Sequence, residues 1–106
     1  MSKFLVQFNY TGEGVKGLLK EGGTSRRDAT ETLVKSLGGT LEAYYFAFGE
    51  TDGCVIADLP DNTSMAAIAL TVGASGAVTV KTTVLMTPEE VDEAVKKTPS
   101  YRPPGQ

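Results

Sequence analysis

The centre of the chain carries the pattern that most restricts its fold. Two runs rich in aromatic and β-branched residues, Thr40 to Phe48 and Cys54 to Leu59, are separated only by Gly49 to Gly53. Such runs favour extended strands, and a connection this short joins antiparallel neighbours, because a parallel pair needs a much longer crossover. The sequence therefore predicts a β-hairpin around which the other elements are arranged.

Hydrophobic periodicity predicts the remaining elements. Lys3 to Tyr10 alternates with the period of a strand, and Val78 to Leu85 is β-branched almost throughout. Apolar residues at helical spacing predict one helix over about residues 25–37 and another over about 61–72. A capping box with proline at the first helical position, Thr87 to Glu90, opens a short helix that reaches about residue 97.

The order of these elements is strand, helix, strand, strand, helix, strand and an added helix. It predicts an α+β fold of the split βαβ, or ferredoxin-like, kind. Right-handed crossovers place both main helices on one face of a four-stranded antiparallel sheet, and the other face stays uncovered within one subunit. A chain of 106 residues fits one such domain, over residues 1–98, with a polar tail at 99–106.

Composition excludes several function classes. Ten basic and thirteen acidic residues give a net charge of -3, so we expect no nucleic-acid or membrane partner. The absence of histidine excludes Ser-His-Asp and Cys-His catalysis, histidine-ligated haem and the usual zinc sites. We expect neither a cofactor nor a metal. No secretory leader and no run of roughly 18 apolar residues is present, so we expect a cytoplasmic protein.

A glycine pattern and an arginine pair follow the first strand. Gly12, Gly14 and Gly17 form G-x-G-x-x-G, the pattern of dinucleotide sites, but the helix that such a site needs is predicted to be a single turn in a glycine-rich loop over 12–23. We therefore favour a loop over a nucleotide site. Arg26-Arg27 could meet a phosphate or a carboxylate, although cations at a helix start are more often solvated.

The predicted hairpin register places Phe48 opposite Cys54, so that Tyr44 and Phe46 share a face with Asp58. Small alanines on the other face favour close approach of the helices, which assigns the aromatic side to the uncovered face. Because a large apolar surface is unfavourable in water, we expect a second copy of the chain to cover it and to enclose a pocket for a small apolar or aromatic ligand. The candidate ligand-binding residues are Asn9, Tyr44, Phe46, Phe48, Asp58 and Lys81.

Other interpretations stay open. The polar groups could simply pair across a dimer interface, Asp58 with Lys81 and Gln7 with Asn9, in a purely structural oligomer. A cofactor-independent enzyme would use Asp58 or Glu42 as its base, with Lys81 or Tyr44 stabilising negative charge, and would need an acid of raised pKa. The acids of the hairpin connection, at 50 and 52, are interpreted as turn formers.

Several stretches together resemble the GYD-domain family, small bacterial proteins named for a Gly-Tyr-Asp signature near the central hairpin. They are KFLVQFNYT at 3–11, GVKGLL at 14–19, SLGG at 36–39, FAFGETDGCVIADLPD at 46–61, ASGAV at 74–78 and KTTVLMTPEEVDEA at 81–94. Gly49 and Asp52 match the signature, but its tyrosine position looks like Thr51 here. The resemblance implies a ferredoxin-like subunit that assembles as a dimeric α/β barrel. It implies no established activity, and relatives in fold range from cofactor-free monooxygenases and isomerases to binding proteins.

Overall fold

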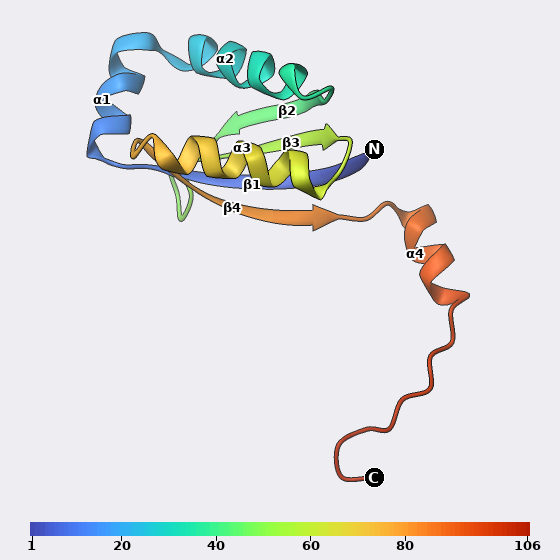
Figure 1. The fold of residues 1–106 in the computed structure, drawn as a ribbon. Coiled ribbons are helices and arrows are strands. Elements are labelled where there is room, and N and C mark those ends of the chain that lie inside the picture. The colour runs from blue at the N-terminus through green and yellow to red at the C-terminus, as the bar shows by residue number, and fades with distance from the viewer.

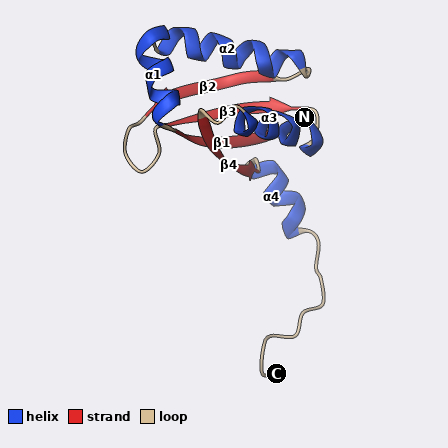
Figure 2. Ribbon diagram, turned by 60° about the vertical axis from the view of Figure 1, so that its left-hand side comes forward, coloured by secondary structure: helices blue, strands red, loops and turns tan.

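The computed structural model describes residues 1–106. Its elements follow the predicted order with one added helix, and they are β1 (Ser2–Tyr10), α1 (Gly12–Glu21), α2 (Gly23–Ser36), β2 (Thr40–Phe46), β3 (Gly53–Leu59), α3 (Asn62–Ala74), β4 (Val78–Leu85) and α4 (Pro88–Val95). The four strands form one antiparallel sheet in the order β2-β3-β1-β4. Helices α2 and α3 cover the same face of the sheet (Figures 1 and 2). The fold is therefore α+β and ferredoxin-like, as predicted.

The glycine-rich stretch after β1 is a helix, α1, and the prediction of a loop is wrong. Thr11 caps the helix, because its hydroxyl accepts a hydrogen bond from the Gly14 N–H at 3.3 Å. Glycine is required at position 14, where a Cβ would lie 2.0 Å from the Ala77 carbonyl oxygen. The low helix propensity of the glycines is thus outweighed by close packing of α1 against the segment before β4. Gly22, with a φ of 84°, then turns the chain into α2.

The connection between β2 and β3 is longer than predicted. Phe46 pairs with Gly53, whereas the predicted register places it opposite Ile56. Residues 47–52 form the loop, and the Ala47 N–H donates to the Asp52 carbonyl oxygen at 2.9 Å. Phe48 has a φ of 58° within this loop. Phe48 therefore lies outside the sheet, because β2 ends at Phe46.

A β-bulge reverses the alternation of β2. Leu41 pairs with Ala57 and Ala43 pairs with Ile56, so β2 has one more residue than β3 between these pairs. After the bulge, each side chain of β2 points to the face opposite the one that simple alternation predicts.

The hydrophobic core lies between the sheet and the helices α2 and α3. Its buried members are Phe4, Phe8, Val34, Val55, Ala57, Leu59, Met65 and Ile68. The other face of the sheet, which we call the open face, carries the alternate side chains of the same registers. They are Lys3, Leu5, Gln7, Asn9, Thr40, Ala43, Tyr45, Cys54, Ile56, Asp58, Thr79, Lys81, Thr83 and Leu85. No helix covers the open face (Figures 1 and 2).

The last helix projects from the body of the molecule (Figure 1). The predicted capping box is confirmed: the Thr87 hydroxyl accepts from the Glu90 N–H at 3.1 Å, and the Glu90 carboxylate accepts from the Thr87 N–H at 3.0 Å. The helix ends at Val95 and residues 96–106 follow it away from the sheet. None of the helices has the length and apolar character needed to cross a membrane.

Candidate functional site

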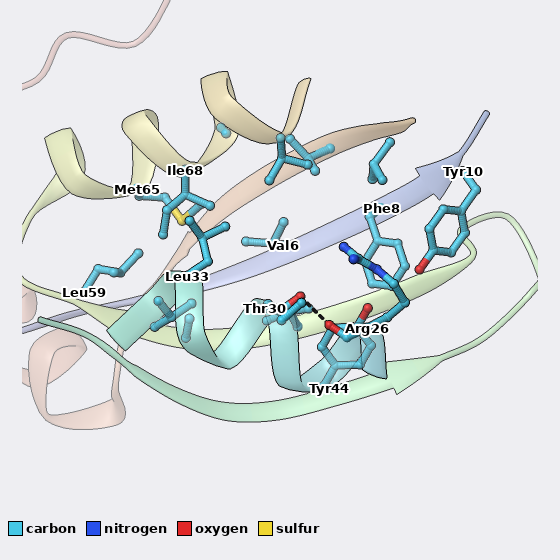
Figure 3. Close-up of a pocket in the computed structure, with 18 residues that line it drawn as sticks. Val6, Phe8, Tyr10, Arg26, Thr30, Leu33, Tyr44, Leu59, Met65 and Ile68 are labelled. Carbon is cyan, nitrogen blue, oxygen red and sulfur yellow. Dashed lines mark hydrogen bonds between the residues drawn. The ribbon is translucent and has the colours of Figure 1, made fainter. Parts of the chain in front are cut away.

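A cavity lies inside the subunit, between the sheet and the two helices that cover it (Figure 3). Its volume is about 120 Å³. All four strands and both helices supply its walls, which are Val6, Phe8, Tyr10, Arg26, Ala29, Thr30, Leu33, Val34, Tyr44, Val55, Ala57, Leu59, Met65, Ile68, Ala69, Val72, Val78 and Val80. The cavity is therefore on the side of the sheet opposite to the predicted pocket.

The size of the cavity restricts what it can hold. A cavity of roughly 150 Å³ with apolar walls binds one benzene molecule and stays free of water when empty. At about 120 Å³, this cavity matches a single small ring and is too small for a nucleotide or a haem. Its walls are apolar except at one end, so most of a bound molecule would be apolar as well.

The polar side chains gather at one end of the cavity. Tyr10 reaches it from β1, Tyr44 from β2, and Arg26 and Thr30 from the first half of α2 (Figure 3). Thr30 lies one helical turn after Arg26, and its hydroxyl donates to the Arg26 carbonyl oxygen at 3.0 Å. The opposite end is closed by apolar side chains that include Met65. The cavity thus has an apolar interior and one hydrogen-bonding end.

The Tyr44 phenol is held in its protonated form. Burial between β2 and α2 is the main cause that raises the pKa of Tyr44, and the neighbouring Tyr10 hydroxyl raises it further. The Thr30 hydroxyl and the Arg26 charge oppose this shift. Tyr44 therefore acts as a hydrogen-bond donor at neutral pH and is a poor base.

Aromatic rings continue from the polar end along the helix side of β2. The Phe8 ring lies 5.6 Å from that of Tyr44, and the Tyr44 ring lies 5.4 Å from that of Phe46. Phe48, which is 64% exposed, stacks on Phe46 at 5.7 Å. These offset and edge contacts hold Tyr44 in place by packing.

A second hollow opens beside the polar end, beneath α1. Its volume is about 290 Å³, and it shares Tyr10, Arg26, Val72 and Val78 with the inner cavity. The rest of its wall is more polar and comprises Glu13, Gly14, Gly17, Leu18, Glu21, Ser75 and Ala77. Arg26, whose side chain is 33% exposed, thus lies where the two hollows meet.

Two of the predicted site residues lie on the opposite face from the predicted one. Tyr44 and Phe46 pack against the core beneath α2, so the prediction that they line the uncovered face is wrong. The bulge in β2 is the physical reason, since it reverses the alternation before both residues. Phe48 follows Phe46 to the helix side and is not on the open face either. Of the three aromatic residues, only Tyr44 contributes to the observed cavity.

The remaining candidates stay on the open face, and they line neither of the two hollows. Asp58 forms an ion pair with Lys3 at 3.2 Å, and Lys3 also pairs with Glu42. The hydrogen bond shared with Glu42 and the charge of Lys3 lower the pKa of Asp58. Lys81, interpreted above as a partner of Asp58, is exposed and makes no ion pair. Within one chain the partner of Asp58 is thus Lys3, and the pairing of Asp58 with Lys81 across a dimer interface stays a prediction.

Asn9 is engaged by the hairpin loop. Its Oδ1 accepts from the Asp52 N–H at 3.0 Å, while Asp52 Oδ2 accepts from the Tyr10 N–H at 2.8 Å. The Asp52 N–H also donates to the Phe8 carbonyl oxygen at 2.9 Å. Asp52 is thus a structural residue, as interpreted, but it binds the end of β1 rather than its own turn. The Oδ1 atom of Asn9 is therefore occupied by the hairpin loop.

Of the polar cavity residues, sequence reasoning missed Tyr10 and Thr30, and it named Arg26 as a possible contact for a phosphate or a carboxylate without placing it at a pocket. Arg26 and Thr30 lie four residues apart, which places both on one helix face, and that face also carries Leu33. Tyr10 lies on the same face of β1 as Phe4 and Phe8, because their positions differ by an even number. The sequence therefore contained the spacing that places Tyr10, Arg26 and Thr30 on these two faces. Which face of β2 meets this helix face depends on the bulge, which no local pattern marks.

The family model of the GYD domain matches residues 4–95, which covers β1 from its third residue, the other three strands, α1, α2, α3 and α4. The search of curated proteins and the search of solved structures each returned no match. The matched region contains every residue that lines the cavity. Because this match extends over most of the chain, the protein belongs to the GYD-domain family.

Proposed function

We propose that this protein binds a small, mainly apolar compound with one ring in the cavity between its sheet and its helices. The observation that carries the proposal is the cavity itself: about 120 Å³ with apolar walls and hydrogen-bonding side chains at only one end. Small-molecule sites combine an apolar surface with a few convergent polar groups in this way. The polar end would orient the ligand, and the apolar walls would supply most of the binding free energy.

Binding is favoured over catalysis because the groups of the enzymatic alternative are divided between the two faces of the sheet. Asp58 and Glu42 lie on the open face with Lys3, whereas Tyr44 lies in the cavity. The pKa of Asp58 is lowered, while a catalytic base of this kind needs a raised pKa. No carboxylate lines the inner cavity.

We further propose that two copies of the chain associate through their open faces, as in a dimeric α/β barrel. The single chain exposes 7208 Å², whereas a globular monomer of 11.2 kDa exposes about 5,700 Å². Part of the excess comes from α4 and the tail, which project from the body. The open face contributes as well, because Leu5, Cys54 and Ile56 are only partly buried there. A second copy would cover these side chains.

Ligand titration by NMR tests the binding proposal. Benzyl alcohol, a neutral compound with one ring and one hydroxyl, should shift the resonances of cavity residues in the unmodified protein. Ala69→Leu should abolish these shifts, because residue 69 lines the cavity from α3 and the larger side chain fills it. Ala67→Leu is the matched control, since Ala67 is exposed on the same helix.

Two results would count against binding in the cavity. Absence of any shift in the unmodified protein would favour the purely structural oligomer. Equal shifts in Ala69→Leu and Ala67→Leu would show that the compound binds elsewhere. Circular dichroism of both variants would confirm that each is folded, because overpacking costs about 1–3 kcal/mol.

A further inference from the structure

We infer that the ligand of this cavity is a monocarboxylate with one ring, whose carboxylate binds Arg26 where the two hollows meet. This inference rests on the proposed function and names the chemical class of the ligand. It follows from the position of one cation, from the hydrogen-bonding groups beside it and from the size of the inner cavity.

Most N–H donors of the Arg26 guanidinium are not engaged by another side chain. It carries five N–H donors, and its only side-chain partner is Glu21, at 3.5 Å. That separation is longer than a normal charge-assisted hydrogen bond. The Arg26 side chain extends across the same end of the cavity as the Tyr10 and Tyr44 hydroxyls (Figure 3). An acceptor in the inner cavity could therefore bind this guanidinium without breaking a strong interaction.

The neighbouring groups favour an anion of single charge. Protonated Tyr44 donates a hydrogen bond, and its neutral form does not repel a carboxylate. A planar carboxylate fits the paired N–H groups of a guanidinium. An ammonium group would be repelled by Arg26. A phosphate with two negative charges fits less well, because Arg26 is the only cation here and the acidic residues Glu13 and Glu21 line the outer hollow.

The two glutamates do not prevent binding of a single carboxylate. The Glu13 side chain is 81% exposed and pairs with Lys16 at 3.5 Å, and that of Glu21 is 45% exposed. Ion pairs at the surface contribute about 0–1 kcal/mol, so Glu21 can release Arg26 at low cost. Glu21 would then act as a competitor for Arg26 that the ligand displaces.

The inner cavity fixes the rest of the ligand. Its volume of about 120 Å³ accommodates one ring beyond the carboxylate, with Val6, Ala69 and Val80 among the walls. A longer substituent would have to pass Arg26 into the outer hollow. The structure thus points to a compound of the size and charge of benzoate.

Comparison of benzoate with benzyl alcohol by calorimetric or NMR titration tests the inference. The two probes have the same ring and differ in charge. The unmodified protein should bind benzoate more tightly. Arg26→Gln should weaken benzoate binding by about tenfold or more, the effect of losing a charge-assisted pair, and should weaken benzyl alcohol binding by a clearly smaller factor, because that probe carries no charge.

Two further variants sharpen the test. Glu21→Gln should tighten benzoate binding by about twofold or more, because it removes the competitor of an exposed ion pair, without changing benzyl alcohol binding. Arg27→Gln is the matched control, since Arg27 pairs with Asp28 on the exposed side of α2 and does not line either hollow. It should change neither probe.

The outcomes separate this inference from the proposed function. If benzyl alcohol binds in the cavity but benzoate binds no more tightly, the inference is overturned while the proposed function stands. The inference is also overturned if benzoate binding is the same in Arg26→Gln and Arg27→Gln. If neither probe binds the unmodified protein, both proposals fail.

Discussion

At the scale of single residues, the hairpin loop owes its position to hydrogen bonds with β1. The Asp52 carboxylate accepts a hydrogen bond from the Tyr10 N–H, and the Asn9 side-chain oxygen accepts one from the Asp52 N–H. The same contact fixes the backbone of Tyr10, whose ring lines the cavity. One structural acid thus connects the hairpin loop to the polar end of the cavity.

Asp52→Ala should destabilise the protein by about 1–3 kcal/mol, because it leaves the partly buried Tyr10 N–H without its acceptor. Asp52→Asn keeps a side-chain oxygen and should cost less than Asp52→Ala. Urea unfolding of the two variants measures the difference. Equal losses in both would show that the charge of Asp52, and not its hydrogen bond, is what stabilises the loop.

Tyr44 should make stability depend on alkaline pH. The folded state raises the pKa of this phenol, so the protonated form is favoured on folding. The contribution is complete below the ordinary tyrosine pKa of 10.0 and is lost as the pH rises above it towards the folded-state pKa. The difference in unfolding free energy between the unmodified protein and Tyr44→Phe should therefore shrink when urea unfolding is repeated at increasing pH above about 10.

The neighbouring tyrosine provides the control for this titration. Tyr45 lies on the open face and is 68% exposed, so Tyr45→Phe should leave the pH dependence of stability unchanged. The pKa of Lys3 is also raised, but Lys3 is present in all three proteins, so its contribution cancels in the comparison. A constant difference between the unmodified protein and Tyr44→Phe at all pH values would contradict the assignment.

At the scale of elements, α1 and β2 show where local patterns were sufficient and where they failed. The strands β1 and β4 and the start of α4 follow from alternation, β-branching and a capping box, all of which are local signals. The three glycines of α1 lower its propensity, yet the helix forms because it packs against the segment that precedes β4. In β2, a single extra residue moved Tyr44 and Phe46 to the other face. Both failures concern contacts between segments distant in sequence.

Two glycines of α1 should respond oppositely to the same substitution. Gly14→Ala should destabilise the protein by about 1–3 kcal/mol, because its Cβ would meet the Ala77 carbonyl oxygen at 2.0 Å. Gly17→Ala should stabilise the protein by about 0.5–1 kcal/mol, because no atom lies within 4 Å of its Cβ position. Thermal unfolding of the two variants provides the measurement. Stabilisation by both substitutions would show that α1 does not pack against Ala77.

At the scale of the whole molecule, the sheet separates two surfaces that differ in how they are covered. The helix side contains the core and the cavity, and the open face carries partly buried apolar side chains next to the Lys3 ion pairs. The chain has a radius of gyration of 17.0 Å, against about 13 Å for a compact domain of this length. The projecting α4 and tail account for this difference in shape (Figure 1). Self-association through the open face would leave the cavity accessible on the helix side of each subunit.

Substitution on the open face should dissociate the proposed dimer. Light scattering of the unmodified protein at micromolar concentration should give about twice the 11.2 kDa of one chain, and Ile56→Asp should give the mass of one chain. Leu70→Asp is the control, because Leu70 is 74% exposed on α3, on the helix side of the sheet. It should keep the dimer mass. An unmodified protein of monomer mass would refute association through the open face.

The sequence by itself determined the order of the elements apart from α1, the ferredoxin-like topology and the family, because alternation, helical spacing, caps and short connections act between residues that are close along the chain. It also determined that Asp58 and Gln7 lie on the uncovered side, since β1 and β3 alternate without interruption. Only the tertiary structure decided where Tyr44 and Phe46 point and where the cavity lies. The bulge of β2 and the packing of α1 are set by steric fit between distant segments, and a local pattern contains no record of that fit.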